Sequence, residues 1–111
     1  MNADEMFDSV AEAMVGEPGV TRAKMFGSPG LRVGRKFFGC LVNGKLIIKL
    51  PQARVQAIIG SGGGDPFGHI YRPGMGRMMK EWVAVDPSST TDWLSLSREA
   101  RDFVASAGYP I

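Results

Sequence analysis

Phe37-Phe38-Gly39-Cys40-Leu41-Val42-Asn43-Gly44-Lys45-Leu46-Ile47-Ile48-Lys49-Leu50 is the strongest structural signal in the chain. It contains two segments rich in aromatic and aliphatic residues, separated by Asn43-Gly44. Asn and Gly both tolerate positive φ, so this dipeptide suits the type I′ turn that matches the twist of two antiparallel strands. We therefore predict a β-hairpin at this position.

The two-residue loop also predicts the register of the hairpin. The expected pairs are Val42 with Lys45, Leu41 with Leu46, Cys40 with Ile47, Phe38 with Lys49 and Phe37 with Leu50. Side chains alternate between the two faces of a strand. The expected core face therefore carries Phe37, Leu41, Leu46, Ile48 and Leu50, and the expected mixed face carries Phe38, Cys40, Val42 and Ile47 with Lys45 and Lys49.

Further strands are predicted on both sides of this hairpin. The segment 31–33 is apolar at its ends and precedes Gly34-Arg35, which predicts a second hairpin leading into Phe37. The segment 79–85 ends at Asp86-Pro87 and predicts the last strand. Together these segments predict an antiparallel sheet of four to five strands.

Helical signals occur at both ends of the chain and after the main hairpin. Asn2 and Glu5 form a capping pair, and apolar residues at four-residue spacing predict a helix over 3–15. A short helix is expected over 52–59, and a last helix from Thr90 or Thr91 with Trp93, Leu96, Ala100, Phe103, Val104 and Ala107 on one face. We predict a single α+β domain over 1–111, in which an N-terminal and a C-terminal helix pack against the sheet.

Composition agrees with a single domain that stays in the cytoplasm. The chain has 111 residues, of which 44% are hydrophobic and 22% charged, enough to bury a core. Its apolar runs are far shorter than the roughly 20 residues needed to cross a bilayer, and its N-terminus lacks the basic and apolar pattern of a signal peptide. We expect no membrane contact.

Charge is distributed unevenly along the chain. Residues 1–17 carry five acids and no base, residues 18–80 carry eleven bases and one acid, and residues 81–111 carry five acids and two bases, which gives −5, +10 and −3. The middle segment could present a basic surface to phosphates or to another acidic partner. Alternatively, the acidic terminal helices could pack against the basic sheet and neutralise it internally.

Two groups of bases are candidate nucleic-acid-binding residues, one at the second hairpin and one in the late loop: Arg32, Arg35, Lys36, Arg72, Arg77 and Lys80. Lys80 lies on the same predicted strand face as Trp82. A cation beside an aromatic ring suits phosphate contact and base stacking. Trp82 could instead belong to the core beneath the last helix, with the Lys80 stem over it.

No residue pattern indicates an enzyme, a metal site or a cofactor. The chain has one Cys, Cys40, and one His, His69, which are too few for an intramolecular disulfide or a protein-built zinc site. Cys40 is predicted to be a small buried hydrophobic residue. His69 with Met75, Met78 and Met79 could suggest copper, but core packing is the better explanation of the methionines. The glycines of 60–64 lack the ending of a P-loop, so this segment is either a connector or a weak anion site.

The residues Lys24-Met25-Phe26-Gly27, Gly30-Leu31, Phe38 and Leu46-Ile47-Ile48-Lys49 resemble the N-terminal domain of the TfoX/Sxy family. The segment 76–83 is similar to short stand-alone members of that family, so the resemblance covers about residues 22–104. It implies an α+β fold and a bacterial regulatory role like that of competence regulators. Ser28-Pro29 and Gly34-Arg35 depart from the usual family pattern, and both departures fall in expected loops.

These observations lead to two hypotheses of different kinds. The first is a TfoX-like, non-enzymatic regulatory module that contacts nucleic acid or a transcription protein through its basic loops. The second is a protein-interaction domain, or a homodimer in which the basic surface meets acidic helices of a second copy. A small-molecule anion binder that uses the glycine segment is a third alternative.

Overall fold

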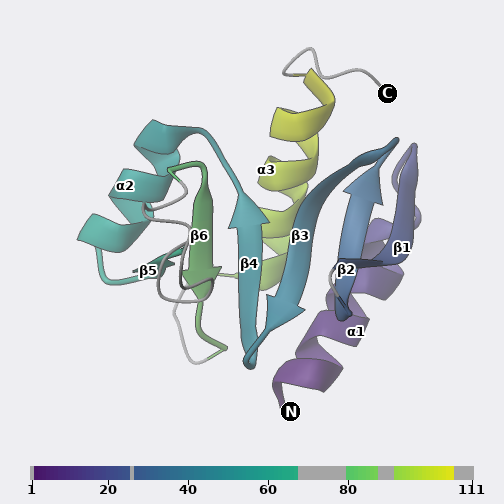
Figure 1. Ribbon diagram of the computed structural model, residues 1–111, viewed down its shortest axis with the longest axis horizontal. Helices are drawn as coiled ribbons and strands as arrows, with labels where there is room; N and C mark the ends of the chain where they lie inside the picture. Colours follow the sequence, from purple (N-terminus) through teal and green to yellow (C-terminus); the bar gives the residue numbers. More distant parts are fainter. Residues whose placement is uncertain (1, 26, 68–79, 88–91, 107–111) are drawn as a thin grey trace.

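The computed structural model describes residues 2–25, 27–67, 80–87 and 92–106. Six strands form one antiparallel sheet in the order β1-β2-β3-β4-β6-β5 (Figure 1). The strands are β1 (Val20–Met25), β2 (Ser28–Val33), β3 (Lys36–Val42), β4 (Lys45–Lys49), β5 (Asp65–Pro66) and β6 (Trp82–Val85), and the helices are α1 (Ala3–Met14), α2 (Gln52–Gly60) and α3 (Trp93–Ser106). The predicted α+β class with a helix at each end is confirmed, and the sheet has slightly more strands than predicted.

The β3–β4 hairpin forms around Asn43 and Gly44 as predicted. Both residues have positive φ, at 51° and 74°, as a type I′ turn requires. The pairing of Val42 with Lys45, Leu41 with Leu46 and Cys40 with Ile47 follows the predicted register, and it ends at Gly39 with Ile48. The predicted pairs of Phe38 with Lys49 and Phe37 with Leu50 are not among the pairs of these strands. Because β4 pairs with β6 on its other side, this hairpin lies at the centre of the sheet.

The predicted faces of the two phenylalanines at the start of β3 are wrong, because β3 contains a bulge. Leu31 pairs with Gly39 but the next residue of β2, Arg32, pairs with Phe37, so Phe38 is the extra residue. An extra residue interrupts the alternation of side chains along a strand. Phe38 is consequently fully buried in the main core, whereas Phe37 is only partly buried. Its ring lies against Gly30, where an added Cβ would come within 3.0 Å of it.

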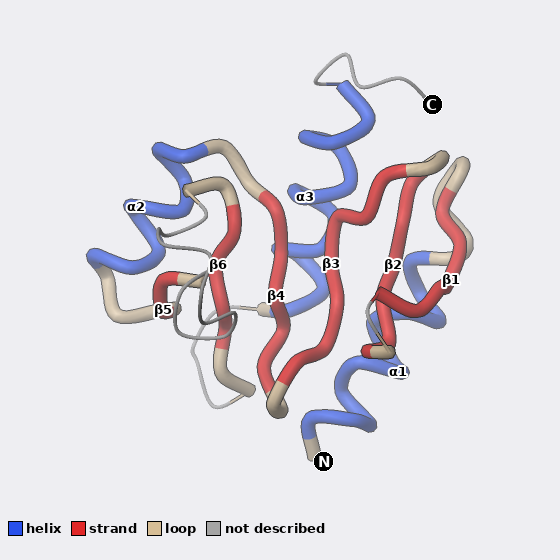
Figure 2. Tube along the Cα trace, viewed as in Figure 1, coloured by secondary structure: helices blue, strands red, loops and turns tan. Residues whose placement is uncertain are grey.

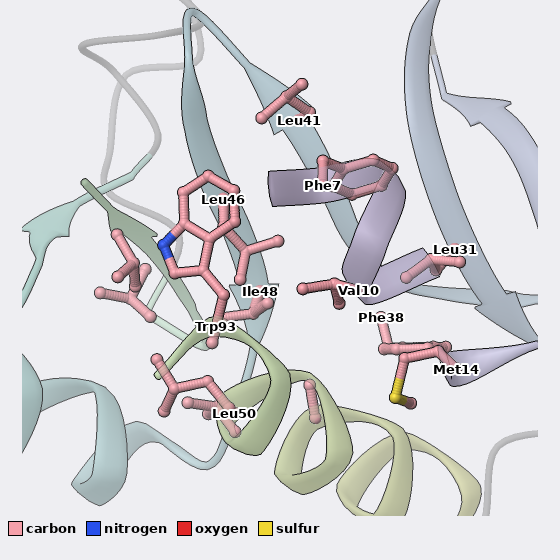
Figure 3. Packing of buried hydrophobic residues seen from close by; sticks show 14 of the residues in the cluster. Phe7, Val10, Met14, Leu31, Phe38, Leu41, Leu46, Ile48, Leu50 and Trp93 are labelled. Carbon is pink, nitrogen blue, oxygen red and sulfur yellow. The ribbon is translucent and has the colours of Figure 1, made fainter. Parts of the chain in front are cut away.

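The main core lies between the sheet and the two terminal helices. Figure 1 shows α1 and α3 on the same side of the sheet, and Figure 3 shows Phe7, Val10 and Met14 of α1 and Trp93 of α3 among the strand residues. The predicted capping box of α1 is present, since the Asn2 side chain accepts from Glu5 N and the Glu5 side chain accepts from Asn2 N. Burial of these apolar side chains is the main favourable contribution to folding.

A smaller apolar cluster occupies the opposite face of the sheet. It consists of Cys40, Ile47, Phe67, Trp82 and Ala84, with Val42 packed against it. Trp82 is therefore a core residue, as one of the two interpretations held. It lies on the face away from α1 and α3, however, and not beneath the last helix.

Two strands were not predicted. β1 pairs with β2 over its whole length but has Arg22 on the face that packs against α1, which disrupts the apolar alternation. β5 lies in the segment 60–66, which was expected to have no regular structure, and pairs with β6. Gly64 makes this possible, because a Cβ at that position would lie only 2.8 Å from Val83 Cγ2.

The boundaries of the last strand and the last helix also differ from the prediction. β6 starts at Trp82, and Lys80 and Glu81 form a turn before it; Met79 lies outside the described residues. α3 starts at Trp93 instead of at Thr90 or Thr91, which also lie outside them. The Asp92 carboxylate accepts from Leu94 N and Ser95 Oγ, and these hydrogen bonds lower the pKa of Asp92. Asp92 thus caps the helix start.

Figure 2 shows that α2 connects β4 to β5 beside the β6 side of the sheet.

The Gly44→Val substitution should lower the free energy of unfolding by about 1–2 kcal/mol, because a β-branched residue must adopt positive φ at this position. Chemical denaturation measures the change. Gly60→Val is the matched control, because an added Cβ there meets nothing within 4 Å and φ is not positive. Equal effects of the two substitutions would contradict the type I′ geometry.

The bulge predicts unequal roles for two adjacent phenylalanines. Phe38→Ala should cost about 3–5 kcal/mol of stability, as for a fully buried ring, and Phe37→Ala about 1–2 kcal/mol because its ring is partly exposed. Denaturant titrations of both variants give the comparison. If Phe38→Ala does not fold, the pair Phe38→Leu and Phe37→Leu should show the same ranking, and the reverse ranking would exclude the bulge.

Candidate nucleic-acid interface

The first group of predicted binding residues lies at the β2–β3 hairpin. Gly34, with φ of 60°, and Arg35 form its loop, and Arg32 and Lys36 lie on the strands beside it. Arg35 and Lys36 are exposed, whereas Arg32 is partly buried and its Nε donates a long hydrogen bond of 3.4 Å to Thr21 Oγ1. In the described part of the chain, no carboxylate forms an ion pair with Arg35.

Of the second group, the structure describes Lys80 alone, and Arg72 and Arg77 lie outside the described residues. Lys80 is exposed in the turn before β6. β3 and β6 are both antiparallel to β4, so they run in the same direction and both begin at one end of the sheet. The turn before β6, which contains Lys80, and the β2–β3 hairpin therefore lie at the same end of the sheet, on either side of β4 (Figure 1).

The acidic helices neutralise part of the basic sheet and its connections. Asp8 of α1 lies 2.9 Å from Arg22 Nη2, and Glu99 of α3 binds Arg54 through two hydrogen bonds of 2.9 and 3.2 Å. The hydrogen bond to Glu99 raises the pKa of Arg54. The alternative that acidic terminal helices neutralise bases of the middle segment is thus confirmed for Arg22 and Arg54.

Two more bases pair with acids near the β5–β6 side of the sheet. Lys45 Nζ lies 3.1 Å from Asp65, and Lys49 Nζ lies 3.9 Å from Glu81. Arg35 and Lys80 are exposed and form no ion pair with a described residue, and the same holds for Lys24 on β1 and Arg98 on α3. Two of these exposed cations, Arg35 and Lys80, lie at the end of the sheet where β3 and β6 begin.

Trp82 is not placed to act as a stacking platform. Only 8% of its surface is exposed, its ring centroid lies 6.4 Å from that of Phe67, and Lys49 Nζ lies 5.9 Å from its ring. A small hollow of about 160 Å³ between α2 and β6 reaches its edge, bordered also by Gln52, Gln56 and Lys80. Binding sites for small molecules usually measure several hundred Å³. The ring contributes to packing, and stacking with a base would require it to move.

The glycine segment after α2 ends the helix and offers no anion cradle. Ser61 N, Gly62 N and Gly63 N donate to the carbonyl oxygens of Ala57, Ile59 and Ile58 at 3.1, 3.1 and 2.9 Å. These N–H groups are already used, and they lie at the helix C-terminus, where the helix dipole repels anions. The geometry favours the connector over the anion site.

Cys40 has the environment of an unreactive thiol. Its side chain is buried in the smaller cluster, and burial raises the pKa of the thiol to about 11. Among the described residues, no group of three metal-ligating side chains comes together. His69 and Met75, Met78 and Met79 lie outside these residues, so the copper alternative is not addressed by the structure.

Lys24 is an exposed cation that was not among the candidate residues. It lies on β1, which was not predicted, and Gly27, a turn-forming residue before β2, was the sequence signal that could have identified the strand. Within the described residues, no helix is long and apolar enough to span a bilayer.

Comparisons with known proteins give no family for this chain: no protein-family model matches it, and no curated protein is significantly similar to it. The resemblance to TfoX/Sxy proteins consequently depends on the short motifs quoted above.

The burial of Cys40 predicts slow reaction with thiol reagents. With a pKa of about 11, only about one thiol in ten thousand is ionised at pH 7. The native protein should react with a disulfide reagent far more slowly than the guanidinium-denatured chain, and absorbance of the released thiolate measures both rates. Equal rates in the native and denatured states would contradict the buried, unreactive environment.

Proposed function

We propose that this protein is a non-enzymatic regulatory module that contacts the phosphate backbone of a nucleic acid. The contact surface is the end of the sheet that carries the β2–β3 hairpin and the turn before β6. The observation that supports this proposal is the exposure of Arg35 and Lys80 at one end of the sheet, without a carboxylate partner among the described residues. Such cations release bound counterions when they contact phosphates.

Arg32 and Lys36 flank the hairpin loop and belong to the same proposed surface. Arg72 and Arg77 lie outside the described residues and stay candidates on the sequence alone, because they precede Lys80 in the chain. Phosphate contacts position a protein on nucleic acid without specifying a sequence. Direct base contacts are not part of the proposal, because Trp82, the aromatic residue beside this surface, is buried.

Two further points support a regulatory role that is not enzymatic. The resemblance to TfoX/Sxy proteins implies regulation of transcription, through nucleic acid or through a transcription protein. In the described residues, the buried Cys40 gives no support to nucleophilic catalysis by this thiol, and the occupied N–H groups of Ser61, Gly62 and Gly63 give none to small-molecule anion binding by the glycine segment.

Binding should depend steeply on salt and on these cations. We expect the protein to bind short duplex or single-stranded DNA at low salt, with an affinity that falls as salt rises. Arg35→Ala with Lys80→Ala should weaken binding and reduce the slope of log K against log salt by about two units, one for each charge removed. Fluorescence anisotropy at several salt concentrations measures both quantities.

Arg98→Ala provides the control for general charge effects. Arg98 is an exposed cation on α3, outside the hairpin and the turn that form the proposed surface, and its removal should change the affinity much less than removal of Arg35. If DNA does not bind at low salt, or if the double variant binds like the parent, the nucleic-acid proposal is wrong. A mass that rises with protein concentration would then favour the alternative of a homo-oligomerisation domain.

A further inference from the structure

β1 forms one edge of the sheet. In the strand order it has β2 on one side and no described strand on the other. Its six residues make it longer than β5, the two-residue strand at the opposite edge. Edge strands of this length can accept an additional strand unless side chains prevent it.

The hydrogen-bonding pattern identifies which backbone groups of β1 face outward. Gly34 N donates to Gly19 O at 3.0 Å, so these residues form a hydrogen-bonded pair. In antiparallel strands such pairs recur at every second residue, here at Thr21 with Arg32 and Ala23 with Gly30. The N–H and C=O groups of Arg22 and Lys24 must therefore point away from β2.

The side chains at this edge are cationic and border a hollow. Arg22 and Lys24 lie two residues apart on one face of β1, and with Ala23, Pro29 and Gly30 they line a surface hollow of about 330 Å³. Arg22 forms an ion pair with Asp8 of α1, and the Asp8 side chain remains 65% exposed. Lys24 is exposed, and in the described part of the chain no carboxylate pairs with it. Lys24 is the stronger attraction for an incoming acid.

We propose that β1 binds an extended acidic peptide of a partner protein by strand addition. Two acidic residues of that peptide, separated by one residue, pair with Arg22 and Lys24. Each acidic residue exchanges backbone hydrogen bonds with the basic residue opposite it, and its carboxylate lies beside the hollow. Main-chain hydrogen bonds supply affinity in this mode of recognition, and the alternate side chains supply specificity.

Charge argues against a second copy as the added strand. An antiparallel β1 pair centred on Ala23 would place Arg22 of each copy opposite Lys24 of the other, and one centred on Arg22 would place the two Arg22 residues opposite each other. Like charges opposite each other are destabilising. The same cations favour an acidic strand. This inference uses the β1 edge alone and does not depend on the proposed contact with nucleic acid.

The test uses the full chain and the capped peptide Ser-Thr-Glu-Val-Glu-Thr-Ser. Binding should protect the amides of Arg22 and Lys24 from hydrogen exchange in NMR spectra, whereas the amides of Thr21 and Ala23 should change less because they already bond to β2. Lys24→Glu should weaken binding about fivefold to tenfold, because it replaces an attractive cross-strand pair with a repulsive one. Arg98→Glu, which makes the same change of charge at an exposed residue of α3, should leave the affinity unchanged.

Two altered peptides separate strand addition from simple attraction of charges. A peptide with Lys in place of both Glu residues should not bind, and a peptide with N-methylated Glu amides should bind weakly although it keeps its charge. Failure to protect the amides of Arg22 and Lys24, or undiminished binding of the N-methylated peptide, would overturn the proposal. If these amides become protected without peptide when the protein concentration is raised, the proposal is wrong and the edge binds a second copy. If DNA protects them and the peptide does not, the proposal is wrong and the edge binds nucleic acid.

Discussion

The register of the β3–β4 hairpin is the constraint on which the rest of the structure depends. It is imposed by the turn at Asn43 and Gly44, and it directs Leu41, Leu46 and Ile48 toward the terminal helices. A shift by one residue would turn these side chains to the other face and expose them. β4 lies between β3 and β6, so the same register also positions β6 and, through it, β5.

The bulge at Phe38 is the second local feature with wide consequences. Without it, strict alternation would place Phe37 in the main core and Phe38 on the opposite face. The extra residue instead gives the main core a fully buried ring at Phe38 and leaves Phe37 to pack against Gly30. That contact requires that residue 30 has no side chain, so the packing of β3 against β2 at this point depends on Gly30.

Charge is distributed in this fold so that some cations are neutralised and others remain available. α1 and α3 supply the acids that pair with Arg22 and Arg54, and exposed ion pairs of this kind add little stability. Their effect is to restrict the available positive charge to particular places, among them Arg35 and Lys80 at one end of the sheet and Lys24 at the β1 edge. A weakly positive chain can in this way present distinct basic surfaces.

The sequence by itself determined the α+β class, the capped N-terminal helix and the β3–β4 register, because each depends on neighbouring residues. Turn dihedrals, capping and periodicity are local properties and can be read from a short segment. Only the tertiary structure decided the bulge at Phe38, strands β1 and β5, and the partners of the bases. Strand β5 and the ion pairs depend on contacts between segments far apart in the chain, such as Asp65 with Ala84 and Glu99 with Arg54, and no local pattern records which distant residues will meet.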